Sequence, residues 1–171
     1  MNKLLNGIDS LSYWSGKLAS YLIIPLTLVI CYTVIMRTFF SQSPDWGFEI
    51  SIFLYGIGIL IGGAEVLRVN EHVSVDVFPR LVSERMRNIL AIVSTLIIIV
   101  VCLIMMVQGY NSAMTSTLIS ERSSHQSSFN PPIWWYKWII PLAASLVFLQ
   151  AIKRLVEEIK TAAGKGGKND Y

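Results

Sequence analysis

Residues that commonly carry chemistry are scarce in this sequence. Its two cysteines, Cys31 and Cys102, form no Cys-x-x-Cys pair, which argues against a thiol-oxidising enzyme. Its two histidines, His72 and His125, lie in polar segments and offer no facing pair of haem ligands inside a helical bundle. Charged residues make up only 15% of the chain, there is no Gly-rich phosphate loop, and no helix face has His/Glu metal spacing. We therefore predict no catalytic, metal-binding, substrate-binding or cofactor-binding residue, and no nucleic-acid partner.

Apolar residues, by contrast, are in excess, and they come in four long runs. Hydrophobic residues make up 53% of the chain, and the mean hydropathy is +0.54. Each run approaches the roughly 20 residues that an α-helix needs to cross about 30 Å of hydrocarbon. We predict an all-α membrane protein with one four-span domain over residues 1–160 and a flexible basic tail over residues 161–171. The predicted transmembrane spans cover residues 18–40, 48–67, 89–108 (extending to about 118) and 133–155.

The lysines and arginines are distributed unevenly between the polar segments. Eleven of the 14 lie before the first span, between the second and third spans, or after the fourth. The positive-inside rule then places both termini and the middle segment in the cytoplasm. Residues 3–17 have apolar positions at helical spacing, which fits either a short interfacial helix or an extension of the first span. Residues 79–87 are predicted to form an amphipathic cytoplasmic segment that leads into the third span.

Charged residues flank the second span at both edges. At the outer edge, Asp45 is placed to cap the helix, and Glu49 follows one turn later. Glu49 can complement the helix dipole or pair with Arg37 near the end of the first span. At the inner edge, Glu65 and Arg68 are three residues apart and can pair along the helix surface.

Between these charges the second span is rich in glycine. Gly58 and Gly62 have the spacing that lets another helix approach closely, and Gly63 follows them directly. Lipid supplies no hydrophobic force that drives helices together, so such a face indicates close contact with protein. The pattern leaves open whether the facing helix belongs to this chain or to a partner.

Beyond the second span, three residues with side chains that can bind metal fall within a short segment. Glu71, His72 and Asp76 could hold a divalent ion. Alternation along this segment places Glu71 on the side opposite the other two. A solvated loop with a hydrogen-bonded histidine is therefore the favoured interpretation.

Aromatic residues gather at the start of the fourth span. Such residues at a span boundary are typical of the interface belt that anchors membrane proteins at headgroup level. Stacking on a sugar or a base is a less favoured alternative, because no polar groups alternate with the rings. The predicted anchors are Trp14, Trp134, Trp135, Tyr136 and Trp138.

The motifs around the second span follow one another in a characteristic order. They are Arg37-x-x-Phe40, Asp45-Trp46-x-x-Glu49, Gly62-Gly63-Ala64 and Arg68-x-x-x-His72-Val73-x-Val75-Asp76. Pro131-Pro132-Ile133-Trp134 follows before the fourth span. In this order they resemble the small membrane subunit (DctQ-like) of the tripartite ATP-independent periplasmic (TRAP) transporters of bacteria and archaea.

This resemblance implies a scaffold subunit that binds no substrate itself. In such systems a large membrane subunit moves an organic anion, a carboxylate or sulfonate, driven by sodium, and a soluble periplasmic protein delivers that anion. The resemblance predicts these two proteins as partners in the inner membrane, with sodium coupling in the large subunit. The small subunit would brace the large one and help dock the periplasmic protein. The residues assigned a partner-interface or structural role are Arg37, Asp45, Trp46, Glu49, Gly58, Gly62, Gly63, Glu65, Arg68, His72 and Asp76.

An independent small transporter or channel is the alternative function. Four spans of this size could assemble as a homo-oligomer, with Arg37, Glu49 and Glu65 lining a path. Co-purification separates the two hypotheses, because a scaffold should be isolated with a much larger membrane partner. An enzyme is the third and least favoured class.

Overall fold

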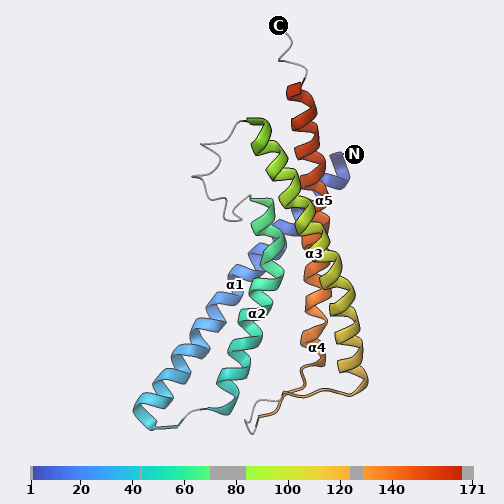
Figure 1. The fold of residues 1–171 in the computed structure, drawn as a ribbon. Helices are drawn as coiled ribbons and strands as arrows, with labels where there is room; N and C mark the ends of the chain where they lie inside the picture. The colour runs from blue at the N-terminus through green and yellow to red at the C-terminus, as the bar shows by residue number, and fades with distance from the viewer. Residues whose placement is uncertain (1, 43, 70–83, 124–128, 167–171) are drawn as a thin grey trace.

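The computed structural model describes residues 2–42, 44–69, 84–123 and 129–166, and most of these residues are helical (Figure 1). Within these ranges, four helical segments are long and apolar enough to cross a membrane. This confirms the predicted all-α membrane fold with four spans and makes the chain a multi-pass membrane protein. The helices are α1 (Asn2–Phe40), α2 (Asp45–Arg68), α3 (Glu84–Leu118), α4 (Trp134–Lys137) and α5 (Ile139–Gly166).

The first two helices begin earlier than the predicted spans. α1 is continuous from Asn2, so the N-terminal segment is an extension of the first span and not a separate helix. α2 starts at Asp45, but the N-cap position belongs to Pro44, so Asp45 lies one position inside the helix. The carboxylate in the first turn and Arg68 in the last turn still complement the helix dipole.

The last two spans are also longer than their apolar runs. α3 continues to Leu118, as predicted for the extension of the third span. α5 continues to Gly166, so the first part of the predicted tail is helical. Of the predicted amphipathic segment at residues 79–87, the described part begins with α3 at Glu84, and the rest lies outside the described residues.

The four spans form an open row (Figure 1). α2 packs against α1 on one side and α5 on the other, and α3 packs mainly on α5. Few side chains are enclosed as a result: none of the most apolar 18-residue window of α1 is buried, and the highest share in any span is 22%. So much outward-facing apolar surface fits a protein that is surrounded by lipid or by a partner.

α1 begins and α5 ends on the same side of the molecule (Figure 1). We call this the terminal side, and we call the opposite side, which carries the turn between α1 and α2, the hairpin side. This arrangement is compatible with both termini lying on one side of a membrane. That the terminal side faces the cytoplasm stays a prediction from the distribution of lysine and arginine.

Candidate functional site

The glycines of α2 contact helices of this same chain. A Cβ built on Gly58 would lie 3.9 Å from the carbonyl oxygen of Ala19 in α1, and one on Gly62 would lie 3.3 Å from the Ala19 Cβ. A Cβ on Gly63 would lie 3.4 Å from Cγ2 of Val147 in α5. Within this chain, the neighbours of these three glycines are therefore α1 and α5, and a role of the same face in binding a partner stays a prediction.

A groove remains beside the contact between α1 and α2. Its volume is about 380 Å³, and apart from Glu65 and the Ser20 and Tyr55 hydroxyls its lining is apolar or glycine. Small residues in the lining bring the helix backbone within reach of an apolar occupant. The lining includes Gly16, Ala19, Leu26, Gly58, Ile59 and Gly62.

The predicted pair of Glu65 and Arg68 is present on the terminal side. Arg68 donates from Nε and Nη2 to the two carboxylate oxygens of Glu65, each at 2.6 Å. The guanidinium also lies 5.8 Å from the ring centroid of Tyr13 in α1. The Glu65 side chain fills the space beside Gly16, where an added Cβ would lie 2.4 Å from its Cγ. The pair therefore helps to seat α2 on α1.

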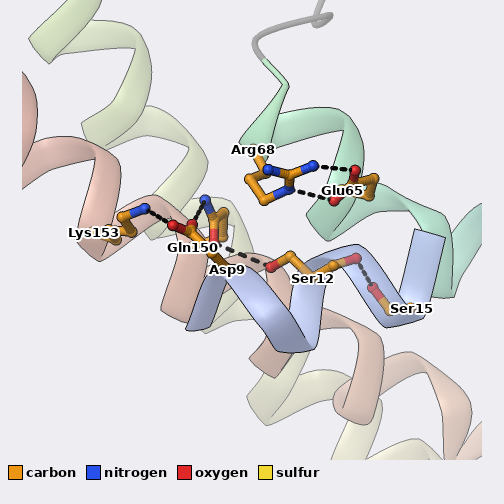
Figure 2. Close-up of polar contacts among 7 residues, drawn as sticks. All are labelled: Asp9, Ser12, Ser15, Glu65, Arg68, Gln150 and Lys153. Carbon is orange, nitrogen blue, oxygen red and sulfur yellow. Dashed lines mark hydrogen bonds and ion pairs between the residues drawn. The ribbon is translucent and has the colours of Figure 1, made fainter. Parts of the chain in front are cut away.

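A polar cluster joins α1 to α5 on the same side (Figure 2). The buried Ser12 hydroxyl donates to Oε1 of the buried Gln150 at 3.0 Å, and Gln150 Nε2 donates to Asp9 Oδ1 at 3.4 Å. Lys153 Nζ pairs with Asp9 Oδ2. Buried polar groups require such partners, so the cluster fixes how α1 crosses α5. Sequence reasoning missed it, and the available signal was the opposite charge of Asp9 and Lys153 on flanks predicted to share one side.

A second polar contact on the terminal side joins α3 to α5. The Thr95 hydroxyl, fully buried, donates to Glu158 Oε2 at 2.9 Å. Arg154 Nε donates to the other carboxylate oxygen of Glu158 at 2.8 Å. Polar contacts therefore tie each outer helix of the row to α5.

On the hairpin side, the described residues do not form the expected ion pair between Arg37 and Glu49. Glu49 is buried, and its Oε1 accepts a hydrogen bond from the Ser123 hydroxyl in the segment after α3. The reason is that Glu49 and Gly47 lie on different faces of α2. Gly47 faces α1, where an added Cβ would lie 2.4 Å from Thr33 Oγ1. Residues two apart on a helix point to different sides, so Glu49 points away from α1 and from Arg37.

The aromatic residues at the start of the fourth span connect helices as well as facing outward. Trp135 and Tyr136 pack on Phe53 of α2, with ring centroids 5.3 and 5.1 Å apart. Trp138 Nε1 donates to Thr117 Oγ1 of α3 at 3.0 Å. These contacts add an inter-helix role to the predicted interface belt.

Of the remaining tryptophans, Trp46 and Trp134 lie at the starts of α2 and α4, and Trp14 lies within α1. Trp14 is 62% exposed, with Lys17 Nζ 5.2 Å from its ring centroid. Trp46 stacks on Tyr32 with ring centroids 5.6 Å apart, which joins the hairpin-side ends of α1 and α2. Trp134 is exposed at the start of α4. Their positions suit residues at headgroup level.

The segment between α3 and α4 is closed by contacts between its two ends. The Ser123 N–H donates to the Pro131 carbonyl at 2.9 Å, and the Ile133 N–H donates to the Glu121 carbonyl at 3.0 Å. Lys137 forms an ion pair with the Glu121 carboxylate. The hydrogen bond from Lys137 holds the pKa of Glu121 below its ordinary value of 4.5.

The segment that was considered as a possible metal site lies outside the described residues. Glu71, His72 and Asp76 belong to residues 70–83, so their roles stay predictions. Within the part of the chain that the structure describes, no group of three His, Cys, Asp or Glu side chains is arranged to hold a metal ion.

Comparison with known proteins gives one family and a curated relative. Residues 26–161 match the family described as "Tripartite ATP-independent periplasmic transporters, DctQ component". The chain is 24% identical over 106 residues to the C4-dicarboxylate TRAP transporter small permease protein DctQ of Vibrio cholerae serotype O1. That alignment covers 62% of this chain and 45% of the relative, so the chain matches less than half of the relative's length.

Proposed function

This chain belongs to the DctQ component family of tripartite ATP-independent periplasmic transporters, and from this premise we propose that it is a small scaffold subunit that braces a large membrane subunit. Such a permease component is generally not an enzyme. The proposed complex lies in the inner membrane of a bacterium or archaeon. It takes up an organic anion, a carboxylate or sulfonate, using a sodium gradient, and a periplasmic protein delivers the anion. The sodium sites and the transport path belong to the large subunit, and this chain helps to dock the periplasmic protein.

The open row of helices is the observation that supports a scaffold best. A carrier that acts alone needs polar groups along an enclosed path through the membrane. Among the described residues, the charged side chains lie towards the terminal side and the hairpin side, and the residues between them are mostly apolar or small. Glu65 is neutralised by Arg68, and Glu49 is engaged by Ser123. This arrangement supports bracing and argues against the homo-oligomeric transporter as the alternative.

Reconstitution with and without the large subunit tests the proposal. Co-expressed with a large TRAP membrane subunit, the chain is expected to co-purify with it and to restore sodium-dependent uptake in liposomes containing the periplasmic protein. Liposomes that contain this chain alone are expected to show no uptake. Uptake by this chain alone would falsify the scaffold function.

A variant of the Glu65–Arg68 pair separates the scaffold from the transporter further. In a scaffold, the double change Glu65→Gln and Arg68→Gln should reduce the yield of the complex, because the pair seats α2 on α1. The sodium concentration that gives half-maximal uptake should stay the same in the complex that does form. A changed sodium dependence would place Glu65 on the transport path and support the alternative.

A further inference from the structure

A second groove lies between α1 and α2 on the hairpin side, and a cation lines it. Its volume is about 320 Å³. The contributing residues recur at i, i+3, i+4 and i+7 on both helices, so the groove follows one face of each for seven residues, about 10 Å. We call this the Arg37 groove. Its lining residues are Ile30, Thr33, Val34 and Arg37 from α1, with Gly47, Phe48 and Ser51 from α2 and Pro44 at the N-cap of α2.

Arg37 is the charged group of this groove that remains available to a ligand. The Thr33 and Ser51 hydroxyls donate to carbonyl oxygens of their own helices, at 2.8 and 2.7 Å. Glu49 accepts from Ser123 on the other face of α2. Arg37 is exposed and forms no ion pair with any residue that the structure describes. Its guanidinium has five N–H donors in a fork that matches a phosphate.

We expect the groove to begin at the depth where lipid phosphates lie, from its place near the end of α1 and from the aromatic residues beside it. Arg37 is one turn from the end of α1 at Phe40. Trp46 and Tyr32 stack beside this end of the hairpin, and aromatic residues of this kind mark the headgroup level. From Arg37 the groove continues towards the membrane centre along Ile30 and its neighbours, where its walls are mostly apolar.

We propose that the Arg37 groove binds a phospholipid, whose phosphate pairs with the Arg37 guanidinium and one of whose acyl chains lies along Val34 and Ile30. Two observations favour this occupant: the charge at the headgroup end and the apolar walls at the hydrocarbon end. A bidentate hydrogen bond to phosphate gives the arginine a counter-ion at the boundary. On the predicted orientation the lipid belongs to the outer leaflet. This site goes beyond bracing, because it makes a bound lipid part of the subunit surface.

Lipid titration of the purified full chain tests the site. The chain in detergent is titrated with dioleoyl phosphatidylglycerol, and bound lipid is measured by native mass spectrometry. Arg37→Gln is expected to weaken binding about tenfold, because one charge-assisted bidentate contact is lost. The matched control is Arg122→Gln, which removes an exposed arginine on the hairpin side outside the groove and should leave binding unchanged. Ser51→Leu narrows the groove without changing charge and should also weaken binding, and circular dichroism checks that each variant is helical.

Three further arms distinguish the chemistry of the occupant. Dioleoylglycerol, which lacks the phosphate, should bind much more weakly, and inorganic phosphate, which lacks the acyl chains, should not displace the phospholipid. Equal lipid binding by Arg37→Gln and Arg122→Gln overturns the proposal, as does displacement by inorganic phosphate. The proposal also fails if Arg37→Gln leaves lipid binding intact and instead releases the large subunit, since the groove would then hold an acidic part of that partner.

Discussion

At the residue scale, single small side chains decide how closely α1 and α2 approach. Gly47 is buried against α1, and an added Cβ would lie 2.4 Å from Thr33 Oγ1 and 3.3 Å from its Cγ2. The Thr33 hydroxyl is itself held by the Val29 carbonyl at 2.8 Å, so it resists displacement. Within a membrane, helix association depends on such packing because lipid is as apolar as the helix surface.

Gly47→Ala should therefore destabilise the protein by about 1–3 kcal/mol, the usual cost of overpacking a close contact. The double variant with Thr33→Ala should recover most of this loss, because it removes both nearest atoms. Gly58→Ala is the matched control in the same helix, since its Cβ would meet Ala19 at an ordinary 3.9 Å. Thermal unfolding in detergent measures all three, and equal melting temperatures for the two single variants would contradict the close approach.

At the element scale, an ion pair joins the segment after α3 to α4. Glu121 follows the end of α3 and Lys137 ends α4, and their pair adds to the two backbone hydrogen bonds that close this segment. Glu49 of α2 accepts a hydrogen bond from Ser123 in the same segment. The segment therefore links three helices on the hairpin side.

The pH dependence of unfolding should report this pair. Because Lys137 lowers the pKa of Glu121 in the folded protein below 4.5, the unfolded state binds more protons in that pH range, and stability rises with pH. The contribution of the pair is present at neutral pH and is lost as the pH falls through the lowered pKa. The melting temperature of the native chain should exceed that of Glu121→Gln at pH 7, and the gap should close towards pH 3. A gap that is independent of pH would show that the charge of Glu121 has no role.

At the scale of the whole molecule, the helices form an open row, and both faces of this row are exposed within the chain. α2 and α5 are the inner helices of the row, and α1 and α3 lie at its edges (Figure 1). Polar contacts on the terminal side tie each edge helix to α5. A broad surface of this kind suits contact with a larger membrane protein.

Cysteine labelling tests the predicted orientation of the row. In a background with Cys31→Ser and Cys102→Ala, Arg122→Cys on the hairpin side should react with a membrane-impermeant maleimide in intact cells. Gly7→Cys on the terminal side, where an added Cβ has no neighbour within 4 Å, should react only after the membrane is permeabilised. The opposite pattern would invert the orientation derived from the lysines and arginines.

The features that could be predicted from the sequence depend on residues that lie close together along the chain. Four apolar runs of membrane-spanning length determined the four helices, because lipid leaves the backbone few other ways to satisfy its hydrogen bonds. Glu65 and Arg68 were predicted as a pair because three residues along a helix bring two side chains together. The motifs around the second span indicated the family that the comparisons show.

Tertiary structure alone decided which distant residues meet. Glu49 has Ser123 as its partner in place of Arg37, because the contact of Gly47 with α1 turns Glu49 to the other side. Asp9 and Lys153 pair although they are 144 residues apart. Hydropathy identifies spans but does not order them, since in lipid every apolar face is equally satisfied. Small residues and a few polar contacts therefore set the open row, and it is this row that leaves Arg37 beside an uncovered groove.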